Sequence, residues 1–431
     1  MKQKVILIGL NELNFELIEK YCEKGYLPNF KSLFLNHGYK QTSSETDHNL
    51  LEPWIQWVSI HTGKMYDEHQ VFRLGDIANR TDLKQLWEIA EGKGLRVGAI
   101  SPFNARNNLK NPEFFVPDPW TQTPPSGNNT LISLSKAISF AVNNNANNRL
   151  GINSAIALLK GFLKFAPVKK YFDYTRLAIF NLKRKATKAI ILDNLLADTF
   201  ISLWKKNQPD FSSLFLNGGA HIQHHYMFNS KVYNGNQKNP EWYCPSGEDP
   251  LLDILNEYDQ IVKEVMGLDC RVFFATGLHQ KPHTENTFYW RLNDHVAFLN
   301  KVPAKGIKSV VPRMSRDFLI VVTDQAAANE IEKQLNSIYS VSDNQKIFSV
   351  DNRGGSLFVE LVYPNDIKSG FSIKIGNKPL ELDFSEYVSF VAIKNGEHHN
   401  IGYFIDTLKK SSASEEIRIK QVFTEIVDSF N

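Results

Sequence analysis

The sequence predicts an α/β fold: a doubly wound, mostly parallel sheet that carries a basic helical insertion and a small α+β subdomain. Two observations lead to this fold class. Short apolar runs without alternation, typical of strands buried on both faces, alternate along the chain with segments of helical periodicity. The 431 residues are 42% hydrophobic and 22% charged, which suffices for a large core and a smaller second unit. Alternating strands and helices of this kind form a parallel sheet covered by helices on both faces.

The first strand and helix set the pattern that later segments repeat. Residues 5–10 form an apolar run, and residues 14–21 follow with apolar residues at helical spacing. We then expect a helix over 83–91, strands over 96–100 and 213–216, a helix over 251–265 and a strand over 271–275. Since ligands of such sheets bind beyond the carboxyl ends of the strands, the residues that follow each strand are the first site candidates.

Two stretches interrupt the alternation and divide the chain. The expected core comprises residues 1–130, 205–317 and 391–431. Between them, residues 131–204 read as a helical cap insertion with an Asn-rich break over 143–148, and residues 318–390 as a small α+β subdomain. In that subdomain we expect strands over 318–322, 356–362 and 371–375 around a helix over 326–338.

The helical insertion is strongly basic. Asp173 is the only acid among nine cations interleaved with aromatic residues; the cations are Lys160, Lys164, Lys169, Lys170, Arg176, Lys183, Arg184, Lys185 and Lys188. Such a segment can lie on an anionic membrane surface or grip a phosphorylated, acidic substrate. A solvated helical cap whose lysines extend their heads into water is an equally open interpretation.

Composition excludes several classes of protein. Three widely spaced cysteines, Cys22, Cys244 and Cys270, indicate neither a disulfide framework nor a thiolate zinc site. The formal charge of +3 does not suggest nucleic-acid binding. The opening apolar run begins at Val5 and is too short for a signal peptide or an anchor, so we expect a cytoplasmic protein, with peripheral membrane contact left open.

Four motifs occur along the chain: the turn Gly25-Tyr26-Leu27-Pro28-Asn29, the segment 57–63 (WVSIHTG) followed by His69, the segment 219–226 (GAHIQHHY) and the segment 396–402 (GEHHNIG). Together they resemble the type I phosphodiesterase and nucleotide pyrophosphatase branch of the alkaline phosphatase superfamily. The resemblance implies that family's doubly wound fold. It also implies a site at the strand exits in which Asp and His residues bind two metal ions beside a Thr or Ser nucleophile.

The family's active-site residues are largely replaced in this chain. Asn11 stands for the first metal-binding Asp, Pro53 for the nucleophile, Ala220 for the next Asp, and the pair Gly277-Leu278 for Asp-His; only His224 and His398 keep their places. Because proline supplies no nucleophilic oxygen, the two-metal mechanism with a covalent phospho-enzyme does not carry over.

Histidines dominate the remaining candidates. Seven of the twelve histidines lie on the loops expected near the site: His221, His224, His225, His279, His283, His398 and His399. We predict that His224, His398 and His225 bind one divalent metal ion, with zinc favoured by imidazole ligands. Residues 221–225 are expected in a loop, so these histidines could instead bond backbone carbonyls or an anionic substrate.

Catalytic candidates come from the exits of the first strand and from the place of the missing nucleophile. We predict Glu52 as a general base, Asn11 as a hydrogen-bond donor to substrate, and His221 as a further acid or base. Glu12, at the same strand exit, could also serve as a general base, but we favour its interpretation as a cap of the following helix, because acids suit a helix N-terminus. Substrate-binding candidates are Trp54, which could equally be core, Gln56, His279 and Arg291.

The leading hypothesis is an enzyme that hydrolyses, or transfers a group from, a phosphorylated or glycosylated substrate through a His-rich site, in a role such as surface-glycan metabolism. Two alternatives stay open. The first is a metal-free transferase or lyase that uses Glu and His as acid and base, and the second is an inactive binding protein on the same fold.

Overall fold

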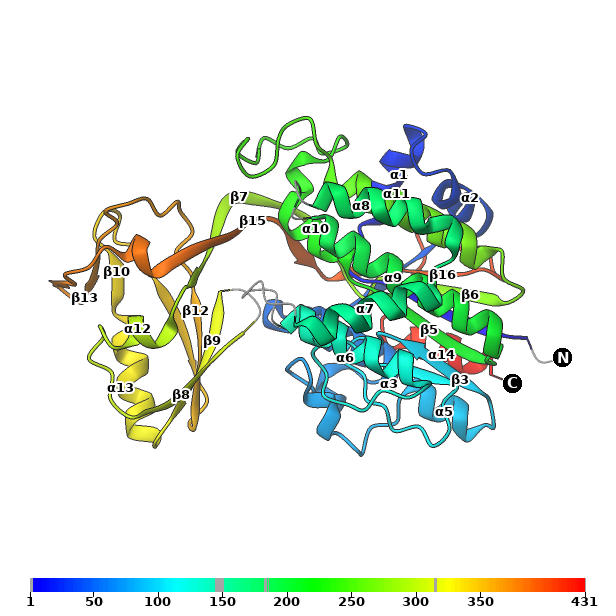
Figure 1. Ribbon diagram of the computed structural model, residues 1–431, viewed down its shortest axis with the longest axis horizontal. Helices are drawn as coiled ribbons and strands as arrows, with labels where there is room; N and C mark the ends of the chain where they lie inside the picture. Colours follow the sequence, from blue (N-terminus) through cyan, green and yellow to red (C-terminus); the bar gives the residue numbers. More distant parts are fainter. Residues whose placement is uncertain (1–2, 144–150, 182–183, 185, 314–315, 431) are drawn as a thin grey trace. The chain divides into compact units, whose positions relative to one another are not determined.

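The structure, a computed structural model, describes residues 3–143, 151–181, 184, 186–313 and 316–430. It divides into two compact units. The first comprises Met1–Asn236, Pro240–Pro282 and Gly396–Asn431, and the second Gln237–Asn239 and His283–Asn395 (Figure 1). The second unit includes the segment 318–390. Parts of the basic insertion lie outside the described residues: Asn144, Asn145, Asn147 and Asn148 of the Asn-rich break, Lys183, Lys185 and the side chain of Phe180, one of its aromatic residues.

An eight-stranded sheet forms the centre of the first unit, in the order β17-β2-β16-β6-β1-β5-β3-β4. β1 (Val5–Leu10) lies between β5 (Phe211–Leu216) and β6 (Arg271–Ala275), parallel to both. β3 (Val97–Ile100) and β4 (Phe114–Val116) extend the parallel part, and β16 (Ile401–Asp406) pairs antiparallel with β6 and with β2 (Lys40–Ser43). β17 (Glu416–Arg418) completes the edge. The predicted mostly parallel α/β sheet is therefore confirmed.

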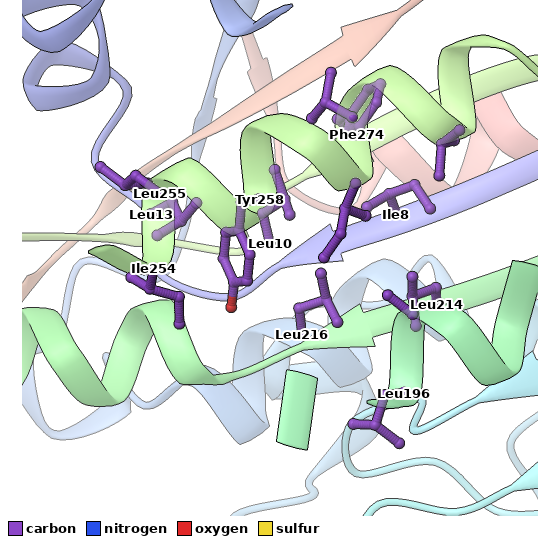
Figure 2. Close-up of a cluster of buried hydrophobic side chains, with 14 of the residues drawn as sticks. Ile8, Leu10, Leu13, Leu196, Leu214, Leu216, Ile254, Leu255, Tyr258 and Phe274 are labelled. Atoms are coloured by element: carbon purple, nitrogen blue, oxygen red, sulfur yellow. The ribbon is translucent and has the colours of Figure 1, made fainter. Parts of the chain in front are cut away.

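Helices cover both faces of this sheet, as the sequence of β1 requires. Ile6, Ile8 and Leu10 point into one apolar cluster, and Val5 and Leu7 into another, because successive side chains of a strand point to opposite faces. α1 (Phe15–Glu23), α2 (Pro28–His37), α9 (Thr187–Asn207) and α11 (Pro250–Met266) contribute to the first cluster. Figure 2 shows part of it. α3 (Pro53–Thr62), α5 (Leu86–Gly92) and α14 (Gln421–Asp428) contribute to the second, so the fold is doubly wound.

The basic segment of the first unit is helical, as predicted. It contains α6 (Asn129–Asn143), α7 (Ile152–Phe165), α8 (Tyr171–Asn181) and the start of α9. α7 packs along α6, where Gly161 admits the side chain of Leu134. Among the described helices, none is both long and apolar enough to cross a membrane.

The second unit is α+β. Its four-stranded antiparallel sheet has the order β11-β12-β9-β8, formed by β8 (Ile307–Pro312), β9 (Asp317–Val322), β11 (Phe348–Asn352) and β12 (Ser356–Leu361). α12 (His295–Leu299) and α13 (Gln325–Asn336) accompany it, with a small sheet of β10 (Ile338–Ser340), β13 (Ile373–Ile375) and β14 (Lys378–Pro379). β7 (His279–Leu292) and β15 (Val388–His399) pair with each other. The three strands and the one helix predicted over 318–375 are present to within a few residues, as β9, β12, β13 and α13.

Candidate metal centre

The centre begins where β1 ends. After Leu10 the chain turns through Asn11 and Glu12, and Glu12 has a φ of +57°, a left-handed conformation that costs a non-glycine residue roughly 1–2 kcal/mol. Three backbone hydrogen bonds hold it there: its N–H donates to the Thr276 carbonyl, and its carbonyl accepts from the Gln280 N–H and the Gln223 side-chain amide. A strained carboxylate residue held by these bonds at a strand exit is a candidate for a functional site.

Three side chains of the first unit meet at this point. Nε2 of His224, on α10 (Gly218–Tyr226), lies 3.0 Å from Oε2 of Glu12, and Nε2 of His398, near the end of β15, lies 3.1 Å from the same oxygen. The two Nε2 atoms are 3.3 Å apart. Glu12, His224 and His398 are thus a group that could hold a metal ion.

The dimensions of this triangle fit a small divalent ion. Ligand atoms about 2.0–2.1 Å from a tetrahedral zinc ion are roughly 3.3–3.4 Å from one another, close to the three separations found here. Two imidazoles with one carboxylate are also a known ligand set of catalytic zinc sites, which leave a fourth position open. The side chain of His224 is 30% exposed, whereas that of Glu12 is 3% exposed, so the triangle is accessible from the His224 side.

The outer ring nitrogens of both histidines lie near groups that orient the rings. Nδ1 of His224 lies 3.4 Å from the Gly396 carbonyl oxygen, and Nδ1 of His398 lies 3.7 Å from Oε2 of Glu52. Metal-binding histidines usually place their second ring nitrogen against a carbonyl or a carboxylate in this way. Both histidines therefore direct Nε2, the nitrogen that a metal would need, toward Glu12.

The Glu12 carboxylate is itself held by two amides. Oε1 accepts a hydrogen bond from Nδ2 of Asn11 at 2.9 Å, and Oε2 accepts one from Nε2 of Gln280 at 2.5 Å. Gln280 also donates to the Ala220 carbonyl oxygen. Because both partners are buried, the carboxylate is fixed in position before any ligand arrives.

Electrostatics make the triangle an ion pair when no cation is present. Burial raises the pKa of Glu12, but the two imidazoles offset this and hold that pKa well below its usual range. Burial lowers the pKa of His398, whereas the carboxylates of Glu12 and Glu52 raise it to about 9 overall. A bound cation would replace the proton of His398, as metal ligands must be deprotonated.

The structure places the predicted catalytic residues at different distances from this centre. Glu52 precedes α3 as its N-cap and is partly exposed beside His398, and Pro53 is the first residue of that helix. Asn11 is buried: Nδ2 donates to Glu12 and to Oδ1 of Asn217, and Oδ1 accepts from the Trp57 indole. Asn11 therefore orients Glu12, and its role as a donor to substrate stays a prediction.

The histidine-rich segment is a helix, so the expectation that residues 221–225 form a loop was wrong. Helical spacing turns His221 and His225 to one side of α10, where their ring centres are 4.8 Å apart and His221 is exposed. His224 alone faces His398. The ring centre of His225 lies 6.2 Å from that of His224, and the triangle takes its third ligand atom from Glu12.

The other histidines form a separate pair or lie elsewhere. His279 is buried, and its Nδ1 lies 2.7 Å from the Ile401 carbonyl oxygen. Its ring stacks on Tyr403 and is tilted against His399, whose ring centre lies 4.9 Å away. His283 belongs to the second unit, where Nε2 lies 3.2 Å from the Thr287 hydroxyl.

The predicted substrate-binding residues also differ in exposure. The Trp54 indole N–H donates to the Phe72 carbonyl oxygen, and its ring is partly buried against the second apolar cluster. Gln56 is fully buried, and its amide donates to the Leu50 carbonyl oxygen. Arg291 belongs to the second unit, and its substrate contact stays a prediction.

Sequence reasoning missed Glu12. It was interpreted as a helix-cap charge, but Asn14 caps α1 by accepting from the Leu17 N–H. That interpretation was wrong because the chain bends at Glu12 itself, which turns the carboxylate back over the strand exit. A carboxylate one residue after the position of the family's missing Asp was the available signal.

No protein-family model matches the sequence, and neither does any curated protein. Among solved structures, the chain is similar to phosphonoacetate hydrolase from Sinorhizobium meliloti 1021, with 13% identity and a TM-score of 0.48 over 100% of this chain and 96% of that one. It is also similar to murine ectonucleotide pyrophosphatase/phosphodiesterase 5, with 10% identity and a TM-score of 0.44 over 100% and 95% of the two chains.

Proposed function

We propose that the protein is a hydrolase of phosphorus esters that depends on one divalent ion, most suitably zinc, held by Glu12, His224 and His398. The observation that carries the proposal is the triangle of ligand atoms 3.0–3.3 Å apart at the carboxyl ends of parallel strands. The four motifs support phosphorus chemistry because His224 and His398 occupy the places of metal-binding histidines in the family that they resemble. A phosphorylated glycan as the natural substrate is a narrower form of the same proposal.

A zinc ion in such a site lowers the pKa of bound water and polarises a phosphoryl oxygen. Glu52 is the proposed general base, which would accept the proton of the attacking water; the position of its partly exposed carboxylate beside the triangle supports this role. Pro53 replaces the family's nucleophile, so the water oxygen would form its bond to phosphorus directly while the ester oxygen leaves. We therefore expect a single displacement without a covalent phospho-enzyme.

Charge narrows the substrate class. A dication, the Glu12 carboxylate and two neutral imidazoles sum to one positive charge. That charge, which the Glu52 carboxylate beside the triangle lowers further, suits the single negative charge of a phosphodiester or a phosphonate monoester better than a phosphomonoester, which brings close to two. We therefore propose monoanionic phosphorus esters as the preferred substrates.

The test compares turnover of bis(p-nitrophenyl) phosphate and p-nitrophenyl phosphate by the zinc-loaded protein, by the same protein after removal of metal with dipicolinate, and by the protein reloaded with zinc. The proposal expects hydrolysis of the diester in preference to the monoester, its loss after chelation and its recovery with zinc. Turnover that chelation leaves unchanged would contradict it, as would the absence of turnover of either compound at full zinc occupancy.

One observation favours a second candidate function, metal-free acid–base catalysis. The carboxylates of Glu12 and Glu52 hold the pKa of His398 at about 9, so its imidazolium is a ready proton donor at neutral pH, and Glu52 is a neighbouring base. This candidate expects activity that survives chelation and that the His398→Gln substitution abolishes.

A further inference from the structure

Helix α7 exposes a stripe of large apolar side chains. Ile152, Ile156, Leu159 and Leu163 are 80%, 46%, 57% and 54% exposed. Their spacing of four, three and four residues places them within about 60° of the helix circumference at roughly 100° per residue. They therefore form one continuous apolar line on the outside of the first unit.

The opposite side of α7 is already used by the fold. Phe165 is buried in the first apolar cluster, Leu158 and Phe162 pack against that cluster, and Gly161 lies against Leu134 of α6. The helix is thus apolar on two sides, and folding accounts for only one of them. α11 differs from α7 because folding uses most of its residues. Ten of them are buried, and charged residues, Asp253 and Lys263, lie near its two ends.

The apolar exposure continues from α7 into α8. The Phe162 and Tyr171 rings, with centres 4.8 Å apart, pack the two helices together. Beyond α7, Val168, Phe172 and Ile179 are 76%, 77% and 59% exposed. Among the described residues, these three and the α7 stripe are seven of seventeen exposed large hydrophobic side chains, and all seven lie between residues 152 and 179. We call them the α7–α8 apolar set.

Cations accompany this set. Lys160, Lys164, Lys169 and Arg176 are exposed on the same two helices and the turn between them, and Asp173 is the only acid between residues 151 and 181. Lys170, by contrast, is directed inward, where it pairs with Asp198 and Glu264. Lys169 stays 75% exposed, although its Nζ lies 3.8 Å from Oε1 of Glu264. Exposed apolar side chains interspersed with cations match a lipid surface that carries negative charge.

We propose that the α7–α8 apolar set is a docking surface for an anionic membrane, on which the two helices lie flat with their apolar side chains among the acyl chains and their cations at the lipid phosphates. α7 has 14 residues and, at about 1.5 Å per residue, is too short to cross a bilayer. The cations that accompany the set favour anionic lipid over a second copy of the chain, since two copies would bring like charges together. The catalytic proposal is independent of this surface.

The experiment is flotation of the full chain with vesicles of phosphatidylcholine alone and of phosphatidylcholine mixed with phosphatidylglycerol. The apolar variant is Ile156→Gln/Leu159→Gln/Leu163→Gln, and the charge variant is Lys160→Gln/Arg176→Gln. A matched control, Leu35→Gln/Leu408→Gln, removes two equally exposed leucines elsewhere on the first unit, which are 67% and 58% exposed.

We expect binding to the anionic vesicles that weakens between 0.1 M and 1 M salt, as the Debye length falls from about 10 Å to 3 Å. The apolar variant should bind at least about tenfold more weakly. The charge variant should lose roughly 25-fold, about fivefold for each cation. The control should bind like the unchanged protein.

Two results would overturn the proposal. One is the absence of binding to anionic vesicles at low salt by protein that light scattering shows to be monomeric. The other is a dimer that the apolar variant converts to monomer without any vesicle binding, which would assign the set to a contact between copies. The thermal midpoint of each variant, which should stay within a few degrees, shows that a loss of binding is not a loss of folding.

Discussion

In most proteins charged side chains lie at the surface and large apolar side chains lie inside. The metal-centre triangle and the α7–α8 apolar set are opposite exceptions to this rule. At the centre, a carboxylate that is 3% exposed is buried between two imidazoles. On α7 and α8, seven large hydrophobic side chains are left in water. Folding alone favours neither arrangement, because burying charge and exposing apolar surface both cost free energy.

The two regions differ in what offsets this cost in free energy. Glu12 is compensated within the chain by Asn11, Gln280 and the two imidazoles, so the centre is complete before any ligand binds. The proposed compensation of the apolar set is a lipid surface outside the chain. Substitutions in the two regions should therefore differ in kind as well as in size.

The largest effect is expected from the ligands themselves. His224→Ala and His398→Ala should each lower kcat/KM for a phosphodiester by at least about 10³-fold, because each removes a ligand of the ion that supplies the chemistry. His225→Ala, on the same helix but outside the triangle, should stay within about threefold. Equal losses in all three variants, measured at saturating zinc, would mean that the triangle has no special role.

A smaller effect is expected for the proposed base. Glu52→Gln should lower kcat by about 10²–10⁴-fold at saturating zinc while the chain still binds one zinc ion, because general-base catalysis contributes about that much and Glu52 lies outside the triangle. The measurement pairs initial rates with metal analysis of the same sample. A variant with full activity would remove Glu52 from the reaction.

The pH dependence of stability should show that His279 is buried in its neutral form. Burial, with the neighbouring His399, lowers the pKa of His279 from 6.5 to about 4, so between these values the unfolded chain binds more protons than the folded one. Its contribution to stability is present above pH 6.5 and is lost as the pH falls toward 4, by up to about 1.4 kcal/mol per pH unit.

The check is urea unfolding at pH 7 and pH 5. His279→Asn, whose amide can still donate to the Ile401 carbonyl, should reduce the loss of stability between these pH values by about 2 kcal/mol. An unchanged pH dependence in this variant would show that His279 is not held neutral.

The smallest effects are expected on the outer side of α7. Leu159→Gln and Leu163→Gln should each change the free energy of unfolding by no more than about 0.5 kcal/mol, whereas Phe165→Ala on the buried side should cost about 3–5 kcal/mol. Chemical denaturation in the absence of lipid measures both. A large cost for the outer substitutions would place them in the protein interior.

Much of the fold could be predicted from local pattern. The run from Val5 to Leu10 is apolar at every position except Gly9 because both faces of β1 are covered, and the helix that follows shows its periodicity in the same few residues. The helical nature of the basic segment and the strand pattern of the second unit were visible for the same reason. These features depend on neighbours in sequence, so a single sequence reveals them.

The centre was only half predictable. His224 and His398 were found because the motifs that contain them resemble a family, but Glu12 was not, because its role depends on a left-handed backbone and on partners more than 200 residues away. The helical form of residues 218–226 decided which histidine of α10 faces the centre, and the sequence alone did not settle that form.

The most direct test of the central claim is the zinc content of the reconstituted protein after gel filtration, compared with that of Glu12→Gln and of Glu16→Gln, an exposed glutamate four residues along the chain. The account predicts about one zinc ion per chain in the unchanged protein and in Glu16→Gln, and a loss of at least tenfold in zinc affinity in Glu12→Gln. Absence of zinc from the unchanged protein, or equal zinc in both variants, would contradict it.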